Sequence, residues 1–271
     1  MAVGARAGTA VVTGASAGIG RELALLLARD GFHLVLVARD EQRLHQLGGE
    51  MRERWGTGTT VIPCDLAAPA GARTLAAGVA AAGLEVDVLV NNAGVGAAGA
   101  FSEVPLERQL ALLHLNIVSL TELAHRWLPG MLARGRGRIL NVASTAAFQP
   151  GPFLATYYAS KAYVLSLSEA LAEETRGSGV TVTALCPGPT RTQFFARASM
   201  RESTLARNAV MEAATVAAAG HAGMMRGDRI VIPGFANRAL GAIVRLSPRG
   251  VVTRAVARLN RTRRRDDRAP G

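Results

Sequence analysis

The stretch YYASK at positions 157–161 holds the only lysine of the chain, since 30 of its 31 Lys and Arg residues are arginine. Tyr157 and Lys161 stand four residues apart, so in a helix they share one face. An ammonium ~4 Å from a phenolate contributes up to ~4 kcal/mol at an effective dielectric of ~20, roughly three pKa units. We therefore expect Lys161 to lower the pKa of Tyr157 toward neutrality, where a phenol exchanges protons readily. Tyr158 competes, but it stands only three residues before Lys161.

Two further polar residues could join this pair. Ser144 closes an apolar stretch, 13 positions before Tyr157, and its hydroxyl could stabilise negative charge on a substrate oxygen. The alternatives are that Ser144 only caps a helix, or that Thr145 takes its role. Asn116 is a polar residue in the otherwise apolar segment LLHLNIVSL, and it is either a site residue or a buried structural amide.

The elements that must position these residues alternate between short apolar runs and longer helical patterns. This alternation predicts an α/β fold with a doubly wound parallel sheet and helices on both faces. The helical segment 20–31 places Leu23, Leu26 and Leu27 on one face and ends at Gly31. The six expected strands and a seventh candidate lie at 9–14, 33–38, 59–65, 86–94, 137–144, 180–188 and 229–234.

A glycine-rich turn, TGASAGIG, follows the first expected strand. Gly14, Gly18 and Gly20 would let the backbone turn sharply and approach a pyrophosphate at the next helix N-terminus. An ordinary strand-to-helix turn is the alternative for a glycine triplet taken alone. The spacing resembles the T-G-x-x-x-G-x-G turn of the short-chain dehydrogenase/reductase family. NNAG at 91–94, YYASK at 157–161 and PGPTRT at 187–192 follow in that family's order, so the resemblance covers residues 8–195.

The resemblance implies a Rossmann-type fold and hydride transfer between a nicotinamide cofactor and a carbonyl/alcohol pair. It implies four catalytic residues, Asn116, Ser144, Tyr157 and Lys161. Tyr157 would be the acid, and Lys161 would also bind the cofactor ribose. Together with the residues' own chemistry it gives these expected cofactor contacts: Gly14, Ser16, Gly18, Ile19, Gly20, Arg39, Asp65, Leu66, Asn92, Ala93, Gly94, Tyr157, Lys161, Pro187, Gly188, Thr190 and Thr192. For Ser16 the alternative is helix capping.

The residues after the second expected strand bear on the choice of cofactor. An acidic residue there suits the ribose hydroxyls of NAD, whereas this chain has Ala38 followed by Arg39. A small residue leaves room for a 2′-phosphate and a guanidinium pairs with it, so we expect NADP(H). Asp40 is the counter-argument, because a shift of one residue would place a carboxylate at that position. Asp65 either contacts the adenine or caps a helix.

Aromatic residues flank the expected site and favour a hydrophobic ketone or aldehyde as substrate. Phe194, Phe195 and Met200 would lie on a lid, and Phe148, Phe153 and Leu154 would form the opposite wall, although both sets could instead be core packing. The reaction alternative is a 3-oxoacyl-thioester reductase acting on carrier-bound chains. A scaffold or sensor that binds NADP(H) without turnover is the alternative outside the enzymes.

The charge of +11 is concentrated at the C-terminal end, with +9 in residues 226–271 and +2 before them. We expect one domain over 1–234 and a basic amphipathic extension over 235–271, its last ~10 residues disordered. The extension would contact a membrane surface, dock on a partner or second subunit, or pack on its own domain. No aromatic residues interleave with its arginines, which argues against nucleic acid.

Cysteine usage and the first residues bear on location. Cys64 and Cys186 lie far apart, with no second Cys or His at metal-ligand spacing, so we expect neither a zinc site nor a disulfide framework. The first 20 residues contain no continuous apolar run, which argues against a secretory signal. We expect a cytoplasmic homo-oligomer, a dimer or tetramer, that associates with the inner face of a membrane if the extension is an anchor.

Overall fold

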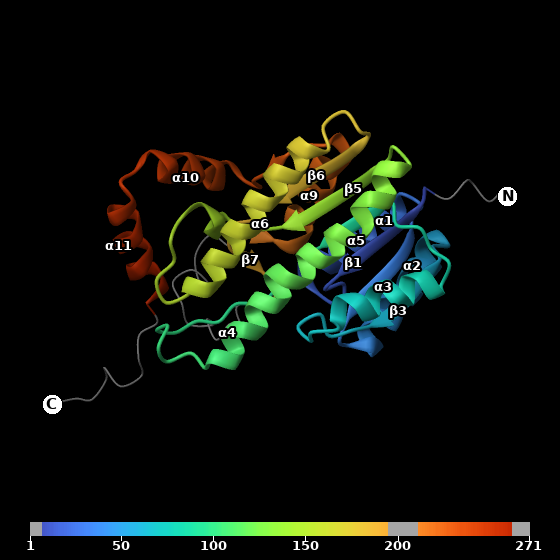
Figure 1. Cartoon of the computed structure of the whole chain (residues 1–271), viewed down its shortest axis with the longest axis horizontal. Helices are drawn as coiled ribbons and strands as arrows, with labels where there is room; N and C mark the ends of the chain where they lie inside the picture. The colour runs from blue at the N-terminus through green and yellow to red at the C-terminus, as the bar shows by residue number, and fades with distance from the viewer. Residues whose placement is uncertain (1–6, 195–210, 262–271) are drawn as a thin grey trace.

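The computed structural model describes residues 7–194 and 211–261, and its centre is a seven-stranded, wholly parallel sheet (Figure 1). The strands follow the order β3-β2-β1-β4-β5-β6-β9, so the order reverses between β1 and β4, where α/β sheets bind ligands. All seven expected strands are present, which confirms the doubly wound fold. Their bounds are β1 Thr9–Thr13, β2 His33–Ala38, β3 Thr59–Pro63, β4 Val88–Asn91, β5 Gly137–Val142, β6 Val180–Leu185 and β9 Ile230–Val231.

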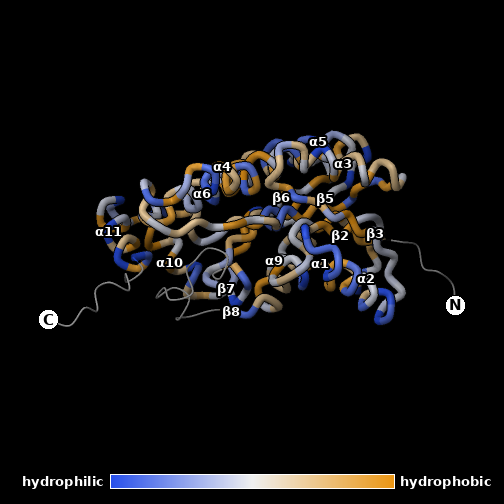
Figure 2. The backbone as a smooth tube through the Cα atoms, turned by 90° about the horizontal axis from the view of Figure 1, so that it is seen from below, coloured by the Kyte–Doolittle hydropathy of each residue, from blue (hydrophilic) through white to orange (hydrophobic). Residues whose placement is uncertain are grey.

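Helices cover both faces of the sheet, which makes three layers (Figure 2). On one face lie α1 (Gly18–Arg29), α2 (Glu41–Trp55) and α9 (Ala213–Arg226). The other face carries α3 (Gly71–Ala81), α4 (Leu106–Leu113), α5 (Leu120–Ala133) and α6 (Ala155–Glu174). The strands β7 (Thr190–Arg191) and β8 (Met211–Glu212) form a small separate pair. Because the central strands are buried on both sides, they consist of continuous apolar residues rather than alternating ones.

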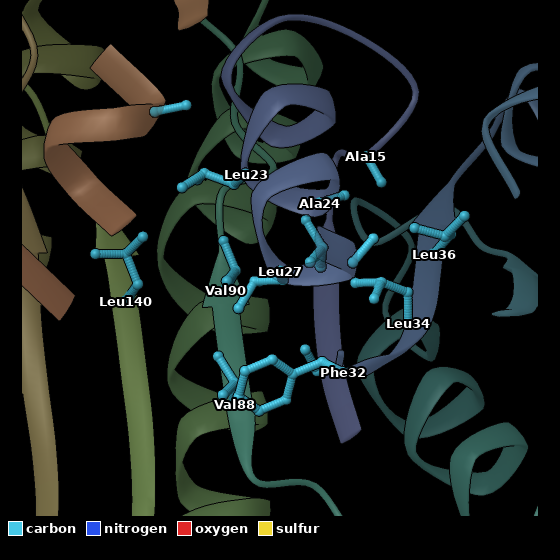
Figure 3. Close-up of a cluster of buried hydrophobic side chains, with 14 of the residues drawn as sticks. Ala15, Leu23, Ala24, Leu27, Phe32, Leu34, Leu36, Val88, Val90 and Leu140 are labelled. Carbon is cyan, nitrogen blue, oxygen red and sulfur yellow. The ribbon is translucent and has the colours of Figure 1, made fainter. Parts of the chain in front are cut away.

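The core beneath α1 shows how sequence pattern becomes packing (Figure 3). Leu23 and Leu27 are fully buried and pack toward Val88 and Val90 of β4. Gly31 follows the helix with φ 88°, a left-handed conformation that glycine adopts without steric cost. The expected helix is thus confirmed, and its packing fixes the glycine turn against the centre of the sheet.

Between α4 and α5 the helix widens into one turn of π-helix, η1 (His114–Ser119). Such π-turns are rare and occur often at functional sites. Asn116 lies within this turn and is 1% exposed. The apolar pattern of the segment predicts a helix but not this widening.

Two helices follow β9 at one end of the molecule: α10 (Phe235–Leu246) and α11 (Arg249–Asn260) (Figure 1). Val252 and Val256 of α11 are buried in a cluster with Leu154 and Tyr158. Of the three roles considered for the extension, the described part of α11 thus packs on its own domain. The division of the chain at residue 234 stays a prediction. The end segment expected to be disordered, 262–271, lies outside the described residues.

Candidate active site

The glycine turn between β1 and α1 brings backbone close to backbone. Gly14 and Gly18 have φ of 67° and 58°, which favour glycine. A Cβ on Gly20 would lie 2.4 Å from the Gly14 carbonyl oxygen, so any side chain there would force the turn apart. The N-cap position of α1 is Ala17, which offers no capping side chain. The first backbone N–H groups of α1 therefore suit an anion such as a pyrophosphate.

Thr13 ties this turn to the NNAG segment, and sequence analysis missed it. Its hydroxyl donates to the Val90 carbonyl oxygen at 3.1 Å and accepts from the backbone N–H groups of Asn92 and Ala93, each at 3.0 Å. The side chain of Asn92 in turn donates to the Thr13 carbonyl oxygen at 2.8 Å. The signal was a polar residue at the end of the apolar strand TAVVT. Asn92 thus holds two loops together at the sheet's switch point.

Three charged residues follow the strands β2 and β3: Arg39, Asp40 and Asp65. The Arg39 guanidinium lies 4.0 Å from the Asp65 carboxylate, and both side chains are at least half exposed. Asp40 caps α2, accepting from the Arg43 backbone N–H at 3.1 Å and pairing with the Arg43 guanidinium at 3.2 Å. Asp40 is therefore occupied by the helix that follows it. Asp65 accepts from the Ala67 backbone N–H at 3.0 Å, so it also shapes its own turn.

Tyr157 lies near the start of α6, with Ser144 beside it at the end of β5. Burial raises the pKa of Tyr157 above its ordinary value, a hydrogen bond with the Ser144 side chain lowers it by less, and Tyr158 raises it further. Ser144 also accepts from the Ala146 backbone N–H at 3.1 Å, so it caps the short 3₁₀ helix Thr145–Phe148 as well. The phenol of Tyr157 is thus held in its protonated form.

Lys161 lies about one helical turn after Tyr157 in α6, and it is buried, with 6% of its surface exposed. Its Nζ donates to the Val142 carbonyl oxygen at 2.7 Å and lies 5.9 Å from the centroid of the Tyr157 ring. Burial lowers the pKa of Lys161 to about 8, and the Cys186 thiol opposes this slightly. The pKa of Tyr157 is thus raised rather than brought toward neutrality, because burial of the phenol dominates and the Lys161 ammonium donates to a backbone carbonyl. Stabilisation of a Tyr157 phenolate by Lys161 stays a prediction.

The side chain of Asn116, in the π-turn, hydrogen-bonds to the segment after β4 and to α6. Its amide donates to the Val95 carbonyl oxygen and to the Ser160 hydroxyl, and its oxygen accepts from the Val95 N–H, all at 3.0 Å. A Cβ on Gly94 would come within 3.3 Å of the Asn116 amide oxygen and 3.4 Å of Lys161 Nζ. Asn116 is thus a buried amide whose hydrogen bonds are structural, as the second alternative expects, while its role as a site residue stays a prediction.

The segment after β6, residues 187–192, contacts the residues after β5 and the glycine turn after β1. Pro187 accepts from the Thr145 backbone N–H at 2.9 Å, and Thr190 donates to the Gly188 carbonyl oxygen at 2.9 Å. The Thr192 methyl group would lie 3.0 Å from a Cβ on Gly18. The turn after β1 and the turn after β6 therefore meet, although they are far apart in sequence.

One cavity of about 1110 Å³ joins all these parts. Gly20 and Asn116 are buried behind its wall, and the other predicted site residues line it. They are Gly14, Ser16, Gly18, Ile19, Arg39, Asp65, Leu66, Asn92, Ala93, Gly94, Ser144, Tyr157, Lys161, Pro187, Gly188, Thr190 and Thr192. Sequence analysis missed the contribution of the extension, which supplies Ala236, Asn237, Leu240, Val256, Leu259 and Asn260 to the same cavity.

Only some of the residues expected to form the walls of the substrate site line the cavity. Phe194 packs against the Tyr157 ring at 5.1 Å between centroids, and Leu154 lines the cavity as expected. Phe148 and Phe153 do not line it; each lies under an arginine of the extension, Arg245 at 5.5 Å and Arg261 at 5.6 Å. Aromatic rings attract guanidinium groups, so these two hold the extension in place. Phe195 and Met200 lie outside the described residues.

Comparison with known proteins decides the family. Residues 8–203 match the family model described as short chain dehydrogenase. The chain belongs to the short-chain dehydrogenase/reductase family. The family and fold expected from the four motifs are thereby confirmed.

Three relatives show how far the similarity extends along this chain and along their own. A short-chain dehydrogenase from Sphingobium yanoikuyae, solved in complex with NADPH, has a TM-score of 0.80 and 33% identity, covering 90% of this chain and 94% of that one. The very-long-chain 3-oxoacyl-CoA reductase of Laccaria bicolor is 40% identical over 66% of this chain and 54% of its own length. The 7beta-hydroxysteroid dehydrogenase of Collinsella aerofaciens is 32% identical, over 67% and 68%. The chain thus matches only about half of the reductase's length.

Proposed function

We propose that this chain is an NADP(H)-dependent reductase of a hydrophobic ketone or aldehyde, acting on a carbonyl/secondary alcohol pair. The observation that carries the proposal is the single cavity in which a dinucleotide-type turn, Ser144, Tyr157 and Lys161 lie together. A scaffold that only binds the cofactor would not require this partly buried phenol and buried lysine beside the cofactor turn.

The residues divide the chemistry between them. The nicotinamide cofactor, when bound, supplies or accepts the hydride. In reduction, Tyr157 gives its proton to the substrate oxygen as negative charge develops there, and the Ser144 hydroxyl donates a hydrogen bond to the same oxygen. Because burial keeps the phenol protonated, Tyr157 is in the state that reduction requires. Lys161 stabilises the phenolate left behind, and Asn116 fixes the wall beside that lysine.

Other residues would hold the cofactor. The uncapped start of α1, with Ser16 and Ile19, would take the pyrophosphate, and the Asn92–Gly94 segment would lie along the ribose. Leu66 and Asp65 would flank the adenine. The backbone near Thr190 and the Thr192 hydroxyl would take the carboxamide.

NADP(H) is favoured over NAD(H) by the charges at the end of β2. The exposed Arg39 offers a guanidinium to a 2′-phosphate, as guanidinium groups do in phosphate sites. Asp40, the carboxylate that would favour NAD, is engaged by Arg43 and the start of α2. The similarity to a dehydrogenase solved with NADPH supports the same preference.

The second candidate reaction is reduction of a 3-oxoacyl thioester. The 40% identity to a very-long-chain 3-oxoacyl-CoA reductase supports it, and an acyl chain would suit the apolar wall of Leu154, Leu240 and Val256. Oxidation of NADPH and of NADH should be compared across bulky ketones, aldehydes and 3-oxoacyl thioesters. Turnover limited to thioesters would favour the second candidate, and no oxidation of either cofactor with any carbonyl would overturn both.

Assembly and location complete the proposal. Leu106, Leu110 and Val118 are 62%, 54% and 45% exposed along α4 and η1, and an apolar surface of this kind suits a contact between copies in a homodimer or homotetramer. The two free cysteines suit the reducing cytoplasm, at the inner face of a membrane where the extension makes contact. Sedimentation at micromolar concentration should give a mass above the monomer, and a purely monomeric chain would contradict the assembly.

A further inference from the structure

The helix α10 turns its apolar side away from the protein. Phe235 is 81% exposed, Leu246 is 89% exposed and Ile243 is 59% exposed. The opposite side of the helix is seated at Gly241, which packs against the Phe148 ring. An amphipathic helix of a water-soluble domain normally buries its apolar stripe in the core. In α10 three of the four largest apolar side chains instead form an outward face, which indicates that something apolar covers it.

The charges within α10 and α11 are of one sign. Residues 235–261 contain six arginines and no acidic residue. Arg238 is exposed on α10, and Arg249, Arg254 and Arg258 are exposed on α11. Arg245 of α10 is exposed as well, but its guanidinium stacks on the Phe148 ring of the domain. A second copy of the chain would bring the same arginines against one another, so an isologous contact through this face is disfavoured. Apolar residues bordered by arginines suit an anionic lipid surface, with rings and alkyl chains in the bilayer boundary and guanidinium groups at the headgroups.

The helices α10 and α11, which carry the outward apolar face and its arginines, also form part of the cavity wall. Leu240 of α10 and Leu259 of α11 line the cavity and are themselves about half exposed, at 48% and 45%. Asn260 pins α11 by donating to the Pro152 carbonyl oxygen at 3.0 Å and accepting from the Tyr158 hydroxyl at 3.4 Å. The cavity wall and the apolar face therefore belong to one helical pair, visible beyond the sheet in Figure 2.

We propose that the outward face of α10, formed by Phe235, Ile243 and Leu246 with Arg238 and the exposed arginines of α11, docks on an anionic lipid bilayer. Within residues 7–194 and 211–261 no helix has both the length and the hydropathy of a membrane span. Docking places the Leu240 and Leu259 wall at the lipid surface. An apolar substrate dissolved in the bilayer then reaches the cavity without passing through water, a consequence that rests on the proposed function, whereas docking itself does not.

The test is flotation of the full chain with two kinds of vesicle, one of phosphatidylcholine alone and one with phosphatidylglycerol added. We expect the chain to float with the anionic vesicles and to be released by high salt, which screens the arginines. The double variants Phe235→Ser/Leu246→Ser and Arg238→Glu/Arg249→Glu should each lose at least tenfold in vesicle binding. The matched controls are Phe101→Ser and Arg73→Glu, which remove an exposed ring or reverse an exposed charge elsewhere, and they should float like the original chain.

Flotation requires no turnover, so its result is independent of the reaction. Failure of the original chain to float, or equal flotation of all variants, would overturn the proposal. So would a fall in sedimentation mass in Phe235→Ser/Leu246→Ser without any vesicle binding, because the face would then be a contact between copies. The melting temperature of each variant excludes loss of folding as the cause.

Discussion

The two ends of the cavity are built by different means. At the proposed nucleotide end, Gly14, Thr13 and Asn92 constrain the backbone within two short loops. At the proposed substrate end, Tyr158 meets Asn260 across 102 positions of sequence, and the wall beside them is packed from apolar side chains. Backbone constraints leave a fixed motif, whereas apolar packing accepts many residues of suitable size. We therefore expect activity to respond to the loss of a single group at the nucleotide end, and to changes in side-chain volume at the substrate end.

The largest effect is expected where the two ends meet. Tyr157→Phe removes the proton donor, so turnover should fall by about 10²- to 10⁴-fold while the dissociation constant for NADPH changes little. Tyr158→Phe is the matched control, because it removes the neighbouring hydroxyl that contacts Asn260 and not the proposed acid. Steady-state NADPH oxidation and fluorescence titration measure the two quantities. Full turnover in Tyr157→Phe, or equal losses in both variants, would reject Tyr157 as the acid.

A smaller effect should be confined to the nucleotide end. Arg39→Ala removes the guanidinium proposed for the 2′-phosphate, and a hydrogen bond to a charged group is worth about 1.5–3 kcal/mol, or roughly 10- to 100-fold in KM for NADPH. KM for NADH should stay the same. Arg52→Ala, an exposed arginine of α2, serves as the control. If Arg39→Ala weakened both cofactors equally, the residue would not be the basis of the preference.

The pH dependence of reduction tests Lys161, which lies beneath both ends. Its pKa is lowered by burial to about 8, so it is an ammonium below pH 8 and an amine above it. Loss of the ammonium removes stabilisation of the phenolate, so kcat/KM for reduction, which reports groups of the free enzyme, should fall as pH rises through about 8, by about tenfold per unit. A profile flat to pH 10 would show that Lys161 stays protonated or is not needed.

The same shift has a consequence for stability. Between pH 8 and 10.5 the unfolded chain keeps the Lys161 proton that the folded chain has lost, so the contribution of this group to the free energy of unfolding rises with pH across that window. Chemical denaturation of the original chain and of Lys161→Met at pH 7.5 and 9.5 should show this rise only in the original. A parallel pH response in both would assign it to other groups.

The smallest effect should be confined to the substrate end. Asn260→Ala leaves the Pro152 carbonyl without its side-chain donor and loosens α11 over the cavity. KM for a bulky apolar ketone should rise about three- to tenfold, as for the loss of one hydrogen bond, with KM for NADPH unchanged. Thr253→Ala, on the same helix but away from the cavity, is the control. A change in KM for NADPH instead would contradict the division between the two ends.

What could be predicted from the sequence follows the same division. The strands, the glycine turn and the pairing of Tyr157 with Lys161 on one helix depend on local conformation, and their placement was correct. The π-turn around Asn116 and the Thr13 contacts to Asn92 depend on hydrogen bonds to distant strands. The raised pKa of Tyr157 depends on burial, which helical spacing alone does not reveal.

The extension was the least predictable part. Phe148 and Phe153 were expected to form the substrate wall, yet they lie beneath Arg245 and Arg261. The pattern of α11 is amphipathic whether the helix contacts lipid, a partner or its own domain, so periodicity could not choose between these surfaces. Only the three-dimensional arrangement shows that α11 faces inward while α10 faces outward.

The solitary lysine has a practical consequence for chemical labelling. Lys161 is the only side-chain amine in the sequence, it is nearly buried, and its lowered pKa leaves a large share of it uncharged at mildly alkaline pH. An amine-directed acylating reagent would therefore modify one side chain, on the floor of the cavity, besides the α-amino group that a chain carries. Protection of the Lys161 amine by a bound dinucleotide, followed by peptide mapping, would give an occupancy assay that needs neither a chromophore nor a known substrate.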